Sequence, residues 1–300
     1  MRIGFGLPVS GTWATPERLG RVAVAAEHQG YDSLWSFQRL FVGEDQQVDP
    51  VYRSVLDPVV ALAFAAARTQ TVRLGVAVIN VPFVHPVYLA KQIASLDVLS
   101  GGRIDLGLGT GWSDAEFTAV GASAERRPAR TREFVSVLRT LWRDDVSAFD
   151  GEFYTVPAGR MHPKPAQEDG VPILLGGTVP AALRRAGEIA DGWVSRSAHD
   201  LSTIAQDIDL VRAGAEKAGR DPDDVRIVCR GSLFRPGRDF LSGSWEKIRE
   251  DVAWLATQGV TEIFYDLNFD PTVAGPDLDP EAAEARAMDI LHNLTPRGLS

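Results

Sequence analysis

Short apolar segments alternate with helix-forming segments along almost the whole chain, and no other feature of the sequence constrains the fold as strongly. Residues 3–7 form the first predicted strand. Thr15, Pro16 and Glu17 then predict a helix start, because threonine caps a helix, proline fits its first turn and glutamate favours its positive end. The helical pattern ends at Gly30, a residue typical of a helix C-terminus. The same order of strand and helix then repeats.

The number of these repeats predicts the fold class. The predicted strands span residues 3–7, 33–37, 72–80, 104–108, 173–175, 192–195, 225–233 and 261–267. Strands that alternate with helices require right-handed crossovers and a parallel sheet. About eight such units close most simply into an α/β fold of the (β/α)₈ TIM-barrel type. We therefore expect one barrel domain over residues 1–300.

One region interrupts the alternation, between the fourth and fifth predicted strands. Residues 149–154 indicate a hairpin around Asp150-Gly151, and a proline-rich loop follows. We expect residues 144–171 to form an excursion over the barrel mouth. A passive insertion on the surface is the alternative, because exposed loops tolerate insertions.

The charge balance excludes several classes of partner. The chain has 31 Lys and Arg against 40 Asp and Glu, a formal net charge of -9. Nucleic acids and anionic membranes bind to basic surfaces, so neither partner is expected. A phosphorylated cofactor would be repelled at long range, and its site would need a local cluster of backbone N–H groups and arginines. We therefore expect an acidic enzyme with a small-molecule substrate.

Cysteine and histidine usage narrows the class further. Cys229 is the single cysteine, which excludes an internal disulfide framework and a multi-cysteine metal site and suits a reducing compartment. The five histidines lack metal-ligand spacing with nearby carboxylates, so no metal is expected. No segment approaches the length that spans a membrane. A cytoplasmic location is expected.

Two glycine-rich segments stand at predicted strand ends, where barrel enzymes place their active sites. The first, DLGLGTGW at residues 105–112, leaves room for a flat ligand. It does not fit the dinucleotide fingerprint G-x-G-x-x-G, because Trp112 stands where the third glycine belongs. It resembles the glycine-rich loop of S-adenosylmethionine-dependent methyltransferases, which is a rival interpretation, although three strand and helix units precede it here.

The second glycine-rich segment is Leu175-Gly176-Gly177-Thr178, which ends a strand and opens a helix. Free N–H groups and the helix dipole predict a phosphate site, with Thr178 as helix cap or phosphate ligand. A plain helix start is the alternative. The cations that could complete a phosphate site are Lys164, Arg184, Arg185, Arg196 and Arg230.

An ordered set of motifs resembles the luciferase-like monooxygenase superfamily. The motifs are LGVAV at residues 74–78, Pro86, LDVLSGGR at 96–103, GLGTGW at 107–112, Glu116-Phe117 and PILLGG at 172–177. The set is most similar to the actinobacterial branch that uses the deazaflavin coenzyme F420 in place of FMN. This resemblance implies an oxidoreductase that binds F420, with FMN as the alternative cofactor, and a homodimer.

The resemblance also implies a cofactor site. At Ala77-Val78, relatives have a bulge with a non-proline cis peptide that presses on one face of the cofactor ring. The loop Gly109-Thr110-Gly111 would line the edge of the ring, and Trp112 and Glu116 would border the pocket. The turn Gly176-Gly177-Thr178 would take the phosphate.

One departure from the family affects the chemistry. Many relatives carry a histidine after the second strand, whereas this chain has Gln38 and Arg39 there. Neither is a base at neutral pH, so each would orient the substrate or stabilise developing negative charge. This argues against alcohol oxidation by a histidine base at that position. His85 and His162 could serve as the acid or base instead, although a structural role is the simpler interpretation for a lone histidine.

The leading interpretation is hydride transfer between a deazaflavin and an unidentified small organic substrate. A deazaflavin lacks the ring nitrogen that lets a flavin handle oxygen, and it therefore acts as a hydride carrier. An FMN-dependent monooxygenase of the same fold is the runner-up. A methyltransferase is a third interpretation, and a non-catalytic barrel that has lost its cofactor is a fourth.

Overall fold

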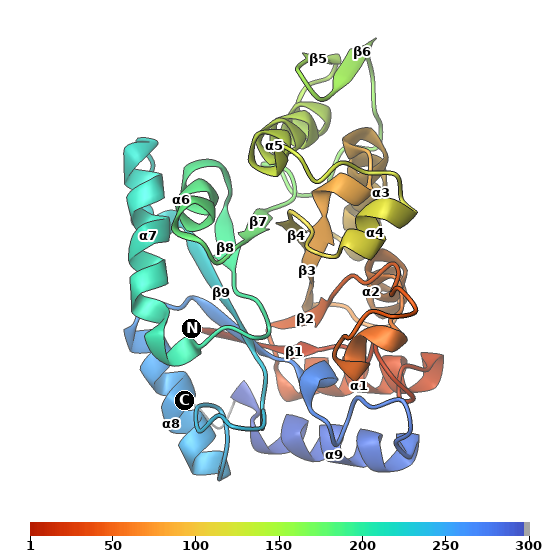
Figure 1. Cartoon of the computed structure of the whole chain (residues 1–300), viewed down its shortest axis with the longest axis vertical. Coiled ribbons are helices and arrows are strands. Elements are labelled where there is room, and N and C mark those ends of the chain that lie inside the picture. Colours follow the sequence, from red (N-terminus) through yellow and green to blue (C-terminus); the bar gives the residue numbers. More distant parts are fainter. Residues whose placement is uncertain (297–300) are drawn as a thin grey trace.

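Eight parallel strands close into a barrel in the computed structural model, which describes residues 1–296 (Figure 1). The barrel strands are β1 (Arg2–Gly6), β2 (Ser33–Ser36), β3 (Arg73–Asn80), β4 (Ile104–Gly109), β7 (Ile173–Gly176), β8 (Gly192–Val194), β9 (Arg226–Gly231) and β10 (Glu262–Tyr265). Their order around the ring is β1-β10-β9-β8-β7-β4-β3-β2, with β2 paired to β1. The predicted parallel barrel is confirmed.

Helices connect these strands and surround the barrel (Figure 1). The α-helices are α1 (Pro16–Gln29), α2 (Pro58–Ala66), α3 (Pro86–Ser100), α4 (Asp114–Ala119), α5 (Arg127–Arg143), α6 (Pro180–Ile189), α7 (Ile204–Lys217), α8 (Trp245–Thr257) and α9 (Pro280–Asn293). Short 3-10 helices are η1 (Pro50–Arg53), η2 (Val81–Phe83), η3 (Leu201–Thr203), η4 (Pro222–Asp224) and η5 (Leu267–Phe269). Thr15 caps α1 and Gly30 ends it at φ 86°, as the sequence predicts. Within residues 1–296, no helix combines the length and the apolar character that a bilayer crossing requires.

The barrel interior is filled by apolar side chains. Trp35 and Phe264 stack inside it, with ring centroids 4.9 Å apart and planes 14° apart. Gly75 on β3 must lack a side chain, because a Cβ there would lie 2.4 Å from the Trp35 ring. Val194 and Val228 are buried in the same cluster. Packing of this kind makes the barrel a core and not a channel.

Charged side chains meet at the N-terminal ends of the strands. Asp105 accepts hydrogen bonds from Arg73 at 2.8 and 2.9 Å and from Arg226 at 2.6 and 3.1 Å. Glu262 pairs with Arg226 at 3.1 Å and with Arg2 at 2.9 Å. Both carboxylates are fully buried, so each needs these partners to remain charged. The network closes the end of the barrel opposite the strand C-termini.

The segment between β4 and β7 contains α4, α5 and the hairpin of β5 (Ser147–Asp150) and β6 (Thr155–Gly159). The two strands pair in antiparallel fashion around the predicted turn. The hairpin extends beyond α5 at the top of Figure 1. It packs beside α3 and α5, and the predicted excursion of residues 144–171 over the barrel mouth stays a prediction.

Candidate active site

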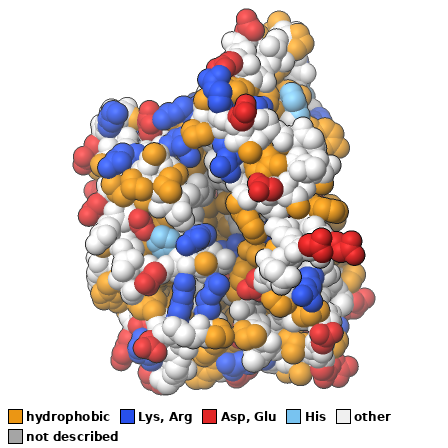
Figure 2. All heavy atoms as spheres, viewed as in Figure 1, with side chains coloured by type: hydrophobic (Ala, Val, Ile, Leu, Met, Phe, Trp, Pro, Cys, Tyr) orange, Lys and Arg blue, Asp and Glu red, His pale blue; other side chains and the backbone are white. Residues whose placement is uncertain are grey.

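A cavity of about 560 Å³ lies at the C-terminal ends of the barrel strands. All nine predicted cofactor-binding residues line it, from Ala77-Val78, residues 109–112 and residues 176–178. Of the predicted catalytic residues, Gln38, Arg39 and Glu116 also line it, whereas His85 does not. Figure 2 shows a hollow on this face with Lys and Arg side chains gathered around it. The fold therefore brings together residues that are far apart in the chain.

A bulge in β3 shapes one wall of the cavity. The pairing register with β4 shifts between Val76 and Ile79, and the Ala77–Val78 peptide is cis, as the resemblance implied. A Cβ at Gly109 would lie 2.5 Å from Val78 Cγ2. This glycine is therefore needed for β4 to pack against the bulge, a reason that the sequence pattern could not supply.

A chain of hydrogen bonds holds the bulge in place. Gln38 Oε1 accepts from the backbone N–H of Asn80 at 2.9 Å. Asn80 Oδ1 accepts in turn from the N–H of Gly111 at 3.0 Å, and Gly111 adopts φ 74°. Gln38 thus connects the end of β2 to β3 and, through Asn80, to the loop after β4. Asn80 was not among the residues predicted from the sequence. Its position at the end of a predicted strand was the only feature that could have indicated a place in the site.

Arg39 and Glu116 form a buried ion pair at the cavity wall. Arg39 Nη1 lies 2.8 Å from Glu116 Oε2, and the two side chains are 4% and 2% exposed. The other carboxylate oxygen accepts from the Leu40 N–H at 2.8 Å. The Arg39 guanidinium lies 4.3 Å from the ring centroid of Tyr52 and 4.5 Å from that of Trp112. These contacts join the loops after β2 and β4.

The turn between β7 and α6 forms a second rim of the cavity. The Gly177 carbonyl accepts from Trp193 Nε1 at 2.9 Å, and a Cβ at Gly177 would lie 2.6 Å from Ala182 Cβ. Thr178 next to it is exposed. Of the cations predicted for a phosphate, Arg196 and Arg230 line the cavity. Lys164, Arg184 and Arg185 are not among the lining residues.

Arg230 is a buried cation in this cavity. Its Nε lies 2.5 Å from Asp266 Oδ2, and its Nη1 donates to the Ala77 carbonyl at 3.1 Å. Its guanidinium lies 4.8 Å from the Phe37 ring centroid and 4.9 Å from that of Phe269. Arg230 therefore connects β9 to the bulge in β3 across the cavity.

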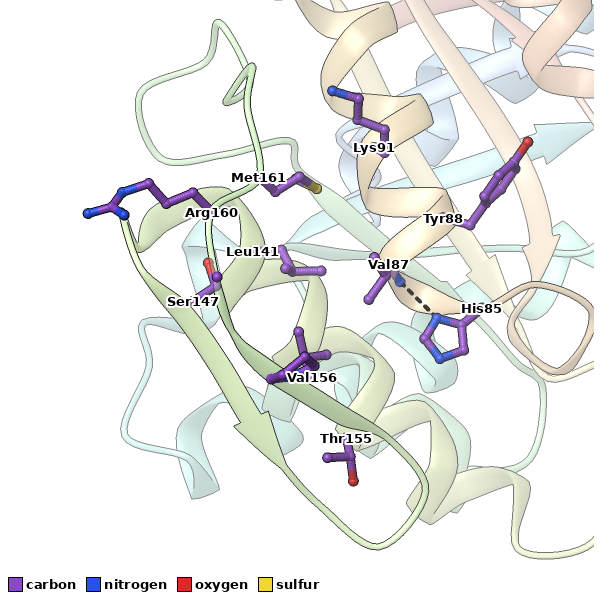
Figure 3. Close-up of a pocket in the computed structure, with 12 residues that line it drawn as sticks. His85, Val87, Tyr88, Lys91, Leu141, Ser147, Thr155, Val156, Arg160 and Met161 are labelled. Atoms are coloured by element: carbon purple, nitrogen blue, oxygen red, sulfur yellow. Dashed lines mark hydrogen bonds between the residues drawn. The ribbon is translucent and has the colours of Figure 1, made fainter.

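His85 lies at a different place. It caps the N-terminus of α3, and its Nδ1 accepts from the Val87 N–H at 3.3 Å (Figure 3). It faces a second cavity of about 740 Å³ that α3, α5 and the hairpin enclose. This cavity contains none of the other predicted site residues. We assign His85 no role in the chemistry of the first cavity. His162, the second histidine considered as an acid or base, is also absent from the lining of the first cavity.

A parallel eight-stranded barrel with glycine-rich loops around one cavity at its strand C-termini is the architecture of a barrel enzyme. Comparison with known proteins identifies its family. The luciferase-like monooxygenase family matches residues 3–235. The chain belongs to this family and is an oxidoreductase, as the motifs predicted.

One relative and two solved structures are similar to this chain. An F420-dependent glucose-6-phosphate dehydrogenase of Nakamurella multipartita is 36% identical over 228 residues, which cover 74% of this chain and 65% of that relative. An F420-dependent secondary alcohol dehydrogenase with an F420-acetone adduct superposes with a TM-score of 0.77 at 18% identity, covering 100% of this chain and 99% of that one. Riboflavin lyase with a modified FMN superposes with a TM-score of 0.80 at 14% identity, covering 100% and 92%. Both structures show the fold alone.

Proposed function

We propose that this protein transfers a hydride between a deazaflavin of the F420 class and a small organic substrate. The main support is that one cavity is lined by three segments: the bulge at Ala77-Val78, the loop at residues 109–111 and the turn at residues 176–178. These segments come from β3, β4 and β7, which are neighbours in the barrel. One elongated ligand can therefore contact all three.

The residues present fit such a cofactor. Gly109 and Gly176 both lie against Val78, where a Cβ would be 2.5 and 3.5 Å from its methyl groups. Because these two residues have no side chains, a flat ring could lie close to the backbone beside the bulge. The phosphate would bind at residues 176–178, where the N-terminus of the ten-residue helix α6 favours an anion. Arg196 lines the same cavity and is exposed, so its charge can add to that of the helix.

The chain's own groups would hold this arrangement. Gln38 and Asn80 fix the bulge against which the ring would rest, and the pair of Arg39 and Glu116 fixes the loop after β4. When bound, a deazaflavin supplies two-electron hydride chemistry. The barrel contributes orientation, and side chains such as Phe37 and Phe269 exclude water from the reacting atoms.

The choice of F420 over FMN is supported by the dehydrogenase relative at 36% identity. The fold does not separate the two cofactors, because it also occurs in riboflavin lyase with a modified FMN. The methyltransferase interpretation loses its basis, since the glycine-rich loop follows the fourth strand of a closed barrel. The homodimer stays a prediction, which sedimentation equilibrium would test.

Parallel titrations test the proposal. The purified protein is titrated with oxidised F420, FMN, NADPH and S-adenosylmethionine, and tryptophan fluorescence is recorded, since Trp112 stands in the cavity wall. We expect saturable quenching by F420 and weaker binding of the other three. Tighter binding of FMN would establish the FMN-dependent monooxygenase instead. If neither F420 nor FMN binds, the proposed function is wrong.

A further inference from the structure

The proposed cofactor segments leave one side of the cavity free. They come from β3, β4, β7 and the loops after them, whereas the remaining wall comes from β2, β8, β9, β10 and the loops after those strands, on the other side of the ring. Phe37, Tyr52 and Phe269 form an aromatic surface there, with ring centroids 5.7 to 6.2 Å apart. A substrate that faces the cofactor would lie against this surface.

Two arginines stand beside the aromatic surface. Arg230 is 7% exposed, and its Nη2 is buried without a hydrogen-bond partner. Arg235 lies in the loop after β9, where its Nη1 donates to the Ser197 carbonyl at 3.2 Å. Its guanidinium lies 5.8 Å from the Phe269 ring centroid. Both arginines therefore reach the same end of the cavity.

The charges around these arginines are not balanced. Asp266 pairs with Arg230, but within residues 1–296 Arg235 has no carboxylate at ion-pair distance. Of the carboxylates that line the cavity, Glu116 is paired with Arg39, and Asp49 is exposed and caps η1. The chain as a whole has a net charge of -9, so a local excess of positive charge in this cavity indicates the kind of ligand that binds there. It favours an anionic ligand.

Two other polar groups of the wall already have partners. Arg39 is held by Glu116, and Gln38 Oε1 is held by the Asn80 N–H. Arg230 is likewise paired, with Asp266, whereas Arg235 has no carboxylate at ion-pair distance within residues 1–296. The stabiliser of negative charge that the sequence placed at residues 38 and 39 is therefore better supplied by Arg235, with Arg230 beside it. A guanidinium presents its donors in a planar fork that matches an oxyanion.

We propose that the substrate is a small organic anion whose carboxylate or phosphate binds Arg230 and Arg235, with its apolar part on Phe37, Tyr52 and Phe269. The reaction of this substrate rests on the proposed function, but its binding does not. The shared chemistry is an oxyanion on an apolar body. Benzoate, phenyl phosphate and the neutral benzamide are suitable probes.

Calorimetric titration tests the proposal, with and without saturating F420. We expect benzoate or phenyl phosphate to bind at least about tenfold more tightly than benzamide, because hydrogen bonds to charged groups are the stronger ones. The anion that binds more tightly shows whether the site prefers a carboxylate or a phosphate. Arg235→Met should weaken anion binding about tenfold and leave benzamide unchanged. Arg21→Met, an exposed arginine on α1, is the matched control and should change neither.

Arg230 needs a conservative variant, because its removal would leave Asp266 buried without its partner. Arg230→Lys keeps the charge and removes Nη2, and we expect it to weaken the anion while the thermal midpoint confirms folding. Equal affinity for benzoate and benzamide, or unchanged anion affinity in Arg235→Met and Arg230→Lys, would overturn the proposal. So would displacement of F420 by the anion, which would assign the arginines to the cofactor. Anion binding in a protein that binds no F420 would leave this proposal standing and remove only the proposed function.

Discussion

The Arg39 guanidinium contacts the Glu116 carboxylate at 2.8 Å while it lies over the rings of both Tyr52 and Trp112. Four residues from three separate segments are thus organised around one buried charge pair. In the sequence the same two residues were candidates for catalysis. Their catalytic role stays a prediction, and their contacts show that the pair joins the segments of the cavity wall.

Glu116→Ala should lower the free energy of unfolding by about 3–5 kcal/mol, because it leaves the Arg39 charge buried without its partner. Urea unfolding measures this change. The double variant Arg39→Met with Glu116→Leu should recover most of the loss, since it removes both charges. A loss below about 1 kcal/mol in the single variant would show that the pair behaves like one at the surface.

Gln38→Leu should weaken binding of the cofactor and lower stability by about 1–3 kcal/mol, because the Asn80 N–H at the bulge loses its acceptor. Gln38→Glu keeps an acceptor oxygen at that place and serves as the control. Fluorescence titration and urea unfolding provide the two measurements. If both variants bind cofactor as the wild type does, Gln38 does not position the bulge.

Thr178→Glu should weaken F420 binding about tenfold by placing a carboxylate beside the proposed phosphate site. Thr178→Gln is the neutral control of the same size, and Thr178 is exposed, so neither change should unfold the chain. Gly177→Asp is a poorer test, because any Cβ there would meet Ala182 at 2.6 Å. Equal affinity of the two Thr178 variants would remove the turn from the cofactor site.

Acid should destabilise the barrel through Asp105. Burial opposes ionisation, but hydrogen bonds and charge from Arg73 and Arg226 outweigh it and lower the pKa of Asp105 from 3.8 to about 2. The unfolded chain therefore binds this proton at a higher pH than the folded chain does. Ionised Asp105 and its arginine partners therefore contribute about 2 kcal/mol to the free energy of unfolding above pH 4. This contribution is lost as the pH falls from about 4 to 2.

Unfolding by urea between pH 2 and 5 measures this dependence. Asp105→Asn should be less stable at pH 5 and should lack this part of the acid dependence. Asp145→Asn is the control, because the Asp145 side chain is 69% exposed. Equal acid sensitivity of Asp105→Asn and the wild type would contradict the assignment.

Cys229 should not react with a chromogenic disulfide reagent in the folded protein. The residue is fully buried in β9, and burial raises the pKa of its thiol well above the ordinary range, which disfavours the thiolate. Absorbance should report one thiol after unfolding in urea and almost none before. Rapid reaction of the native protein would show that β9 opens.

The strands, helices and most cavity residues could be predicted because they depend on short-range patterns. Helix starts at Thr15-Pro16 and helix ends at Gly30 are local signals, and a parallel strand buried on both faces shows an apolar run. Asn80 at the end of β3, Arg235 in a loop and Phe269 in η5 could not be recognised in the same way, since such residues gain a role only from what faces them. His85 lies outside the first cavity and lines the second one, a placement that its position in the sequence does not reveal.

The sequence by itself determined that the chain alternates strands and helices and that glycines end two of the strands. Its motifs also indicated the family and, with it, the barrel fold. The tertiary structure decided which side chains meet. Ring closure sets Arg230 beside Ala77 and Gln38 beside Asn80, residues separated by 153 and 42 positions. Such pairs depend on strand order and register around the whole barrel, and no local pattern encodes them.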